Sequence, residues 1–340
     1  MQTGFSQLHL TTGVSTCALG TSSFHRCADD ASVSVPLLAE YAVTWLETVA
    51  GNVRPNTLEN YAGQLERHVL PRLGDRRLDE IDVDDILGLI GDLRECGYAG
   101  WTIQSILKPL SRLLAHAQRR DIIAFNPISK LERSERPRVG RREQRILNRE
   151  EIGRLLESAA PRYRTLLATA IFSGLRQGEL LGLHWRDLDL AEELIHVRTA
   201  LNRQRLDVPP KTQHGVREVV LMSGLAQALK KHRMQSTFNR PDDFVFASQL
   251  GGPLHWANVS RRALKPALKR AAIQPLRWHD LRHTFASLLI AGGANVVFVS
   301  RQLGHSSTDI TLRVYAHLFD RAEQEHRTRE MLQEMFGNMI

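Results

Sequence analysis

The sequence predicts a mainly α-helical protein with two domains, the second of which carries one small antiparallel sheet of three strands. Three observations support this fold class. The chain has 340 residues, whereas a single domain usually runs to about 100–200. Apolar residues recur at helical spacing over most of the chain, and only the stretch 194–222 changes to the period of short strands. Hydrophobic residues make up 42% of the chain, which is enough to build real cores.

The N-terminal segment, residues 1–33, differs in composition from the rest of the chain. It is rich in Ser, Thr and Gly and has no apolar period, so we expect a disordered or variable extension. No secretory pattern and no apolar run long enough to cross a membrane is present in the chain. Cys17, Cys27 and Cys96 are odd in number and lack the spacing of a disulfide framework, which indicates reduced thiols in a cytoplasmic protein.

A first helical domain is predicted from residue 34 to residue 127. Asp82, with Asp85 three residues later, can cap its third helix, and Pro109 interrupts the fourth helix and is expected to kink it. Four apolar stripes define the inward faces of the helices: Leu38, Tyr41, Ala42 and Trp45; Leu58, Tyr61, Leu65 and Val69; Ile86, Ile90 and Leu93; Ile103, Ile106, Leu110, Leu113, Leu114 and Ala117.

Residues 128–146 have the composition of a basic linker between the domains. The formal charge of the chain is +8, and the stretch from Lys130 to Arg145 holds seven cationic residues against three glutamates, which is +4. Such a linker is either a solvated tether or a segment that lies along DNA phosphates, and the charge pattern favours the second. The candidate DNA-binding residues are Arg133, Arg136, Arg138, Arg141 and Arg142.

The second domain is predicted over residues 147–328, followed by a tail at 329–340. Asn148 and Glu151 form a capping-box pattern before helices near 149–157 and 161–174. Three short strands come next, at 194–197, 205–208 and 216–221. The chain is helical again to its end, where Leu332, Met335 and Phe336 could pack on their own domain or dock into a neighbouring protomer.

Four clusters of polar residues in this domain can carry chemistry. Arg176 stands where a helix ends at a glycine, with Glu179 one turn further on, and Lys211 lies on the predicted hairpin turn. His279 and Arg282 are three apart on one helix face. The last cluster places His305 ten residues before Tyr315.

Each of these residues has an ordinary alternative. Arg176 could be a surface arginine, and Lys231 or Arg217 could take the place of Lys211. His279 and His283 have the i, i+4 spacing of two zinc ligands, but Asp280 stands where a metalloprotease has glutamate, and no convincing third ligand follows.

Taken together and in this order, the clusters resemble the catalytic set of the tyrosine recombinases, or phage integrases. That family carries an arginine before a Gly-x-Glu-Leu helix, a hairpin lysine, a His-x-x-Arg, a Leu-Gly-His and a tyrosine ten residues later. Six positions match in this sequence: Arg176, Lys211, His279, Arg282, His305 and Tyr315. The resemblance covers about residues 36–325 and implies a helical, SAM-like core-binding domain followed by a catalytic domain.

The resemblance implies a site-specific recombinase that cleaves and rejoins DNA through a 3′-phosphotyrosine at Tyr315, with neither metal nor ATP as cofactor. Arg176, Arg282 and His305 would stabilise the phosphate, Lys211 would protonate the leaving oxygen, His279 would assist, and Glu179 would support Arg176.

A DNA-binding protein without catalysis and a type IB topoisomerase are the alternatives. The expected partner is double-stranded DNA. On paired sites the protein would be a homotetramer, and without DNA a monomer, associated with the bacterial nucleoid. The need for accessory proteins and the direction of recombination stay open.

Overall fold

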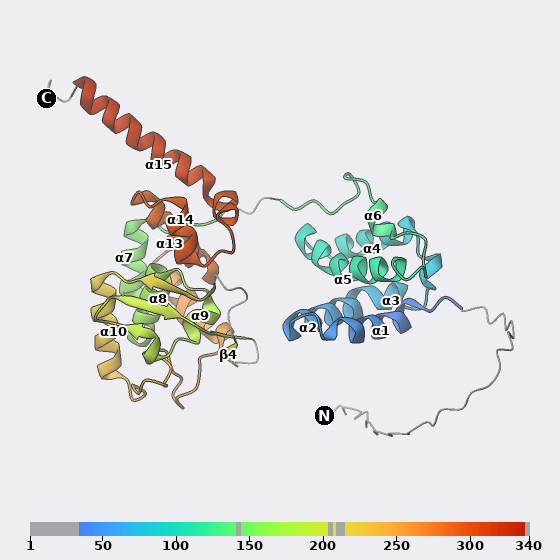
Figure 1. The fold of residues 1–340 in the computed structure, drawn as a ribbon, viewed down its shortest axis with the longest axis horizontal. Coiled ribbons are helices and arrows are strands. Elements are labelled where there is room, and N and C mark those ends of the chain that lie inside the picture. Colours follow the sequence, from blue (N-terminus) through green and yellow to red (C-terminus); the bar gives the residue numbers. More distant parts are fainter. Residues whose placement is uncertain (1–33, 141–143, 203–206, 209–214, 337–340) are drawn as a thin grey trace, which may run out of the picture. The chain divides into compact units, whose positions relative to one another are not determined.

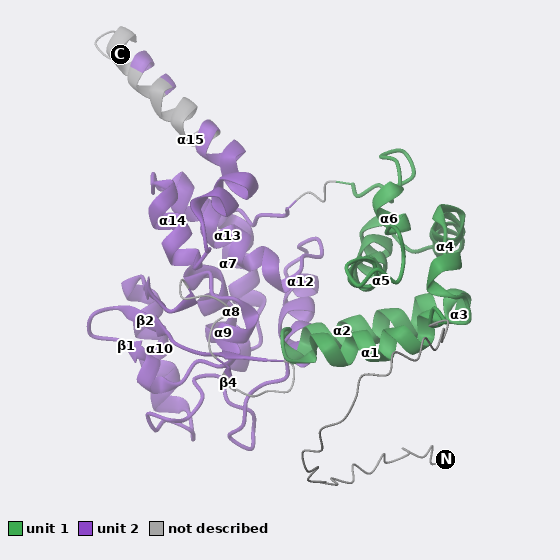
Figure 2. Cartoon of the chain, turned by 45° about the vertical axis from the view of Figure 1, so that its right-hand side comes forward, with its two compact units in different colours: residues 1–140 green, residues 141–340 purple. Residues whose placement is uncertain are grey.

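The computed structural model describes residues 34–140, 144–202, 207–208 and 215–336 (Figure 1). The chain divides into two compact units, residues 1–140 and 141–340 (Figure 2). Three of the predicted site residues, Lys211, Arg141 and Arg142, lie outside the described residues. Across the described ranges, no helix is both long enough and apolar enough to span a bilayer.

Unit 1 is built of helices. Its longer helices are α1 (Leu38–Ala50), α2 (Pro55–Gln64), α4 (Val83–Glu95) and α5 (Gly100–Gln118). A π-helical turn (Leu65–Val69), α3 (Leu70–Leu73), a 3₁₀ turn (Leu78–Glu80) and α6 (Pro127–Lys130) complete it. Helix α5 continues through Pro109 without a break, so the predicted interruption of this helix is wrong.

The core of unit 1 is formed by the four predicted apolar stripes. All of their residues are buried except Leu58, which is half-buried. The predicted cap of α4 is confirmed, because the Asp82 side chain accepts from the backbone N–H of Asp85, and Asp85 accepts in return from the N–H of Asp82.

The segment after α6 packs against unit 1 over most of its length. Leu131 is buried in the core, the Arg136 Nε donates to the carbonyl of Leu131, and Gln104 donates from Nε2 to the carbonyl of Pro137. Arg133, Arg136 and Arg138 are exposed. The three arginines therefore stand on a supported piece of chain, with their charges in solvent.

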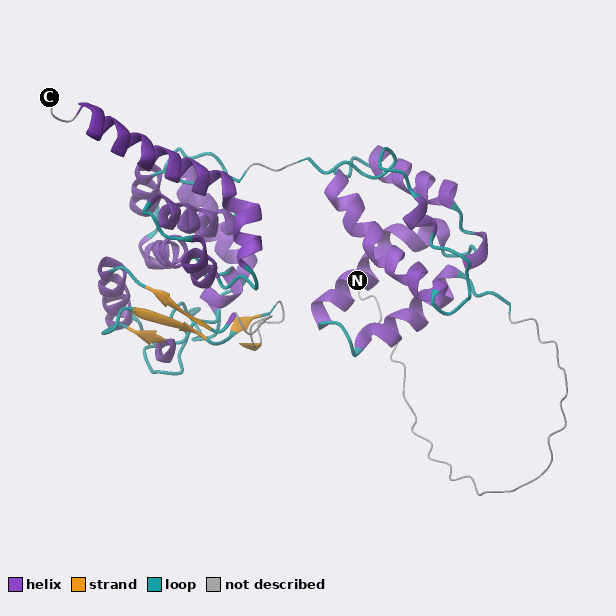
Figure 3. Ribbon diagram, turned by 45° about the horizontal axis from the view of Figure 1, so that its top comes forward, coloured by secondary structure: helices purple, strands orange, loops and turns teal. Residues whose placement is uncertain are grey.

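Unit 2 combines many helices with a few short strands (Figure 3). It contains one large apolar core. Its helical elements are α7 (Arg149–Ser158), α8 (Pro161–Ser173), α9 (Gln177–Leu181), a 3₁₀ turn (Trp185–Asp187), α10 (Ser223–Gln235), α11 (Trp256–Val259), a π-helical turn (Ser260–Leu264), α12 (Lys265–Arg270), α13 (Trp278–Ala291), α14 (Val296–Leu303) and α15 (Thr308–Phe336). The Asn148–Glu151 capping box at the start of α7 is confirmed. Helix α8 packs against α13, which brings the segment of Arg176 close to the helix that carries His279 and Arg282.

The sheet is three-stranded and antiparallel, as predicted, but one of its strands differs. Its order is β1 (Leu188–Asp189), β2 (Leu194–Val197) and β5 (Arg217–Val220), with Ile195 opposite Val219. The predicted strand at 205–208 is wrong as a member of this sheet. Its described part, β4 (Asp207–Val208), pairs with β3 (Ala200–Leu201) in a separate two-stranded ribbon. Strands of two residues carry too little period to reveal their partner.

Candidate active site

The site begins at the turn between α8 and α9. Gly174 ends α8 with φ 60° and ψ 17°, in the left-handed region that favours glycine. A Cβ on Gly174 would also lie 2.2 Å from Cδ1 of Phe285 in α13. The next residues turn sharply, so that Arg176 becomes the N-cap of α9 with a fixed backbone.

Glu179, in the first turn of α9, is a buried carboxylate held by two arginines. It accepts from the Arg176 backbone N–H at 2.9 Å, and its Oε1 accepts from Arg176 Nη1 at 2.8 Å. Arg217, at the start of β5, donates to the same carboxylate from Nη1 at 3.2 Å and from Nη2 at 2.9 Å. Burial alone would raise the pKa of Glu179, but the bonds and charges of Arg217 and Arg176 outweigh burial and hold the pKa below its usual value.

Three arginines meet at the C-terminal end of α14. Arg217 Nε donates to the carbonyl of Gln302 at 2.9 Å, Arg282 Nη2 donates to that of Leu303, and Arg176 Nη2 donates to that of Gly304 at 2.9 Å. The last carbonyls of a helix lack partners within the helix and carry partial negative charge. Three consecutive carbonyls are therefore satisfied by guanidinium groups from three separate elements.

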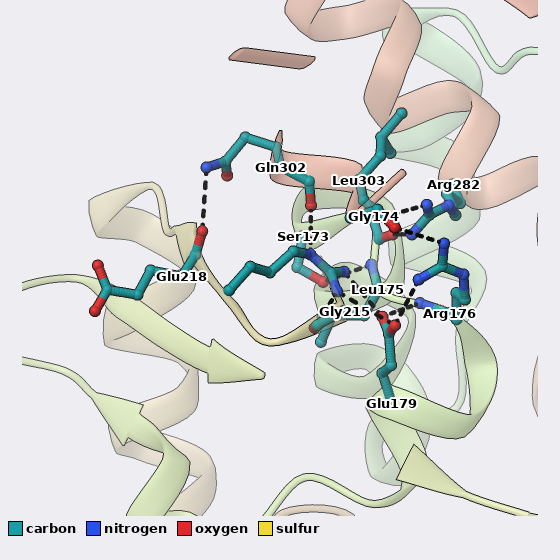
Figure 4. Close-up of polar contacts among 12 residues, drawn as sticks. Ser173, Gly174, Leu175, Arg176, Glu179, Gly215, Glu218, Arg282, Gln302 and Leu303 are labelled. Carbon is teal, nitrogen blue, oxygen red and sulfur yellow. Dashed lines mark hydrogen bonds and ion pairs between the residues drawn. The ribbon is translucent and has the colours of Figure 1, made fainter. Parts of the chain in front are cut away.

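The two predicted phosphate-binding arginines are thus brought together from positions far apart in the chain. Arg282 also donates from Nη1 to the carbonyl of Gly174 at 2.7 Å, which ties α13 to the α8–α9 turn (Figure 4). Each guanidinium has five N–H donors, and the contacts described here use two from Arg176 and two from Arg282. Donors remain on both side chains for an oxyanion.

The two arginines differ in their exposure to solvent. The side chain of Arg176 is 42% exposed, whereas Arg282 is 3% exposed. Burial, together with the like charges of Arg176 and Arg217, lowers the pKa of Arg282 to about 9. The guanidinium of Arg282 stays protonated at neutral pH, and an incoming anion would relieve this repulsion.

His305 comes directly after the turn that the arginines hold. Gly304 ends α14 with φ 61°, and the His305 Nδ1 lies 2.8 Å from the hydroxyl of Thr311 in α15. Burial and the charges of Arg282 and Arg176 lower the pKa of His305 to about 4. His305 is therefore neutral at pH 7. When the Thr311 hydroxyl donates to Nδ1, the proton of the ring lies on Nε2, as a phosphate donor requires.

Tyr315 lies in α15 and is 1% exposed. Its ring packs in a small cluster with Phe285, Ile290 and Val299. Its hydroxyl is 2.6 Å from Nδ1 of His283, which is the residue after Arg282. Burial raises the pKa of Tyr315 to about 12, and the charge of Arg282 opposes that rise.

His279 is exposed, one turn before His283 in α13, and the two rings meet edge to face with centroids 4.9 Å apart. The surrounding protein and the charge of Arg282, with a smaller contribution from Arg176, hold the pKa of His279 below its usual value. With regard to the zinc alternative, the described part of the chain contains no group of three or more residues able to hold a metal ion. His283 contacts Tyr315 instead.

Of the predicted site residues, Arg176 and Arg282 bond the carbonyls directly before His305, and Glu179 bonds Arg176. His279 and Tyr315 both contact His283. Arg133, Arg136 and Arg138 belong to unit 1. Sequence reasoning considered Arg217 only as a substitute for Lys211 and His283 only as a possible zinc ligand, and it gave Thr311 no role. The sequence held one signal for Arg217. It stands two residues before the buried Val219, and residues two apart in a strand share a face, so Arg217 occupies the inward face of β5.

The chain was compared with known protein families. The model of the phage integrase family matches residues 145–322, just over half of the chain, and the N-terminal SAM-like domain of phage integrases matches residues 37–93. The chain belongs to the phage integrase family of site-specific tyrosine recombinases, and it is an enzyme of DNA strand breakage and rejoining. The predicted class, its covalent tyrosine chemistry and the SAM-like first domain are confirmed.

Individual relatives agree with this assignment. The ICEBs1 integrase of Bacillus subtilis (strain 168) is 26% identical over 315 residues, which cover 88% of this chain and 83% of that protein. The Tn1549 transposon integrase in complex with transposon right end DNA has a similar fold, with a TM-score of 0.74, 23% identity, and coverage of 86% of this chain and 99% of the other. A lambda integrase tetramer bound to a Holliday junction gives a TM-score of 0.63 at 19% identity, covering 81% and 76%.

Proposed function

We propose that Tyr315 is the nucleophile of this recombinase and that Arg176, Arg282 and His305 hold the scissile phosphate. The observation that carries the proposal is the convergence of the two arginines on the carbonyls of Leu303 and Gly304, directly before His305. Guanidinium groups are suited to this role, because their planar forks of donors match phosphate oxygens.

Cleavage would proceed by attack of the Tyr315 oxygen on the phosphorus. The new O–P bond forms as the P–O5′ bond breaks, which leaves a 3′-phosphotyrosine and a free 5′-hydroxyl. The bond energy stays in this ester, so a 5′-hydroxyl from another strand can reverse the step without a nucleotide cofactor. Negative charge that develops on the non-bridging oxygens is stabilised by donors already in position, each worth roughly 3 kcal/mol.

Two protons must move during cleavage. Lys211 would donate one to the departing 5′ oxygen, and His279 would assist removal of the phenolic proton or position the phosphate. Glu179 would orient Arg176 and not react itself, in keeping with its hydrogen bonds to both the backbone and the side chain of Arg176.

Tyr315 would have to leave its contact with His283 before it attacks. The side chain is 1% exposed and its oxygen is engaged by a buried ring, whereas a DNA phosphate is bulky and approaches from solvent. We infer that DNA binding moves the first turns of α15, and that the neighbouring positive charge then favours the phenolate.

The partner would be double-stranded DNA. Unit 1 would act as the core-binding domain from about residue 34 to 127, and residues 147–328 as the catalytic domain. The basic stretch 128–146 would carry Arg133, Arg136, Arg138, Arg141 and Arg142 along the phosphates. The DNA in the Tn1549 integrase complex and the tetramer of lambda integrase support a homotetramer on paired sites. Before DNA is bound, the protein would be a monomer. The protein would work in the cytoplasm, at the nucleoid.

The experiment is a trapping assay on a nicked duplex taken from the flanks of the protein's own gene. Once the nick releases a short fragment, religation is slow and a covalent protein–DNA adduct accumulates on a denaturing gel. Wild type should form the adduct, and Tyr315→Phe should bind the same duplex without forming it. Binding without any adduct in wild type would favour a catalytically silent DNA-binding protein, and an adduct in Tyr315→Phe would identify another nucleophile.

A further inference from the structure

Arg217 is the least exposed of the cations that meet at Glu179, and the proposed chemistry gives it no role. Its side chain is 6% exposed, and that of Glu179 is 4% exposed. Its guanidinium donates to both oxygens of Glu179, to the carbonyl of Gln302, and to the carbonyl of Gly215 at 3.1 Å. These bonds occupy most of the five N–H donors of its guanidinium.

The contacts of Arg217 connect three elements of the site. β5 supplies the arginine itself, α9 supplies Glu179, and the end of α14 supplies the carbonyl of Gln302. Gln302 also bonds β5 through its own side chain. Its Oε1 accepts from the N–H of Val220, and its Nε2 donates to the carbonyl of Glu218 (Figure 4). A Cβ on Gly304 would approach Arg217 Nη1 to 2.8 Å, so the turn before His305 lies directly on this guanidinium.

Because Arg217 and Arg176 share the carboxylate of Glu179, the charge of Arg217 also affects how Arg176 can bind a phosphate. Arg176 shares the Glu179 carboxylate with Arg217 and has to present its remaining donors to a phosphate. If Arg217 lost its charge, the buried carboxylate would have Arg176 as its remaining partner of the two and would compete with the phosphate for that guanidinium. A buried ion pair with a purely structural role would not produce such a competition.

We propose that Arg217 is a positioning residue for the strand-cleavage reaction: it neutralises Glu179, so that Arg176 is available to the scissile phosphate, and it holds the turn that carries His305. The inference rests on the proposed function of Arg176. It assigns to Arg217 no contact with DNA.

The test compares single-turnover adduct formation on the nicked duplex, at saturating protein, for five proteins: wild type, Arg217→Met, Arg217→Lys, Glu179→Gln and the double variant Arg217→Met/Glu179→Gln. Arg217→Met should bind the duplex with an affinity within about twofold of wild type and cleave about 10- to 100-fold more slowly, the usual range for an outer partner of a reactive group. Arg217→Lys keeps the charge and should cleave at an intermediate rate.

The double variant is the decisive protein. Removal of the Glu179 charge should release Arg176, so the double variant should cleave about fivefold or more faster than Arg217→Met alone, a coupling of the size seen between residues in contact. A matched control is Arg198→Met, since Arg198 pairs with the buried Asp187 at 3.4 Å outside this cluster, and its cleavage rate should equal that of wild type.

The inference is overturned if Arg217→Met cleaves like wild type, or if the double variant is no faster than Arg217→Met. It is also overturned if the rates of all variants follow their melting temperatures alone. If Arg217→Met does not fold, Arg217→Lys is compared with Arg217→Lys/Glu179→Gln instead. Arg217→Lys should then cleave more slowly than wild type at an equal melting temperature, and the added Glu179→Gln should raise its cleavage rate. A wild type that forms no adduct refutes the proposed function itself, so the two failures are distinguishable.

Discussion

At the scale of single residues, the site is arranged around hydrogen-bond donors and not around a cluster of acids. Arg176 and Arg282 arrive from helices α9 and α13 and are fixed by backbone carbonyls before any ligand binds. Donors whose positions are set in advance need no reorganisation when charge develops, which is why they stabilise a transition state more than water can.

The first residue-scale prediction concerns Arg176→Lys. A lysine keeps one charge but cannot bond Glu179, the Gly304 carbonyl and a phosphate in the same geometry. We expect cleavage of the nicked duplex to fall about 100- to 1,000-fold, with duplex affinity changed by less than about threefold. A gel-shift titration run beside the adduct assay separates the two quantities, and equal loss of both would show a binding role only.

The second residue-scale prediction concerns pH. The folded protein lowers the pKa of His283 and of His305 to about 4 from an ordinary 6.5, with burial the largest cause for both. Between pH 6.5 and pH 4 the unfolded chain therefore takes up protons at these positions that the folded chain does not. The free energy of unfolding must fall as the pH falls through this window, by at most about 3 kcal/mol for each histidine.

The measurement is the melting temperature at pH 7 and pH 5, where most carboxylates are still ionised at both values. Wild type should melt lower at pH 5, and His283→Phe should lose part of that difference. His317→Gln, at an exposed position in α15, is the control for replacement of a histidine outside the buried pair. An unchanged slope in His283→Phe would mean that this histidine does not titrate as described.

At the scale of elements, the site depends on how two helices end. α8 ends at Gly174 and α14 at Gly304, both with positive φ, and each of these glycines is followed within two residues by a predicted site residue. A left-handed C-cap reverses the chain sharply while the last carbonyls point outward. In this protein those carbonyls bind the guanidinium groups that we propose hold the scissile phosphate.

The element-scale prediction is Gly304→Ala. A side chain would be strained at φ 61° and would press on Arg217, so we expect a loss of about 1–3 kcal/mol in the free energy of unfolding, together with slower cleavage. Gly153→Ala is the matched control: it lies inside α7, and a Cβ there meets nothing within 4 Å. Urea unfolding should show the control to be as stable as wild type or more stable, by up to about 1 kcal/mol.

At the scale of the whole molecule, each unit has an apolar core of its own. The core of unit 1 runs from Leu38 to Leu131 and draws on α1, α2, α4 and α5. Leu131 and the Pro137 carbonyl attach the segment after α6 to that same unit. We therefore expect unit 1 to fold independently, because all the contacts named lie within residues 34–140.

The whole-molecule prediction is that a fragment of residues 34–140 folds alone. It should show a helical circular dichroism spectrum and a cooperative melt, whereas a fragment ending at residue 127 should melt lower, because loss of Leu131 and its neighbours leaves the core partly open. Equal melting temperatures for the two fragments would contradict a stabilising role for residues 128–140.

The class of protein, the helical faces and most of the site could be predicted from the sequence alone. Periodicity predicted the buried stripes of unit 1, since a helix repeats its inward face every few residues and the stripe is visible locally. The ordered motifs predicted Arg176, His279, Arg282, His305 and Tyr315 as site residues, since each is marked by its near neighbours in the chain.

Which of these residues touch, and through what, depends on the tertiary packing. The Arg217–Glu179 ion pair and the Tyr315–His283 hydrogen bond join positions that are 38 and 32 residues apart, and β1 is a strand too short to show a period. No local pattern records such contacts, because they depend on how α8, α13, α14 and β5 pack around one another. The three arginines at the end of α14 are the clearest example of a contact set by packing. The last carbonyls of this helix have no partners within the helix, and the packing places Arg176, Arg217 and Arg282 against them.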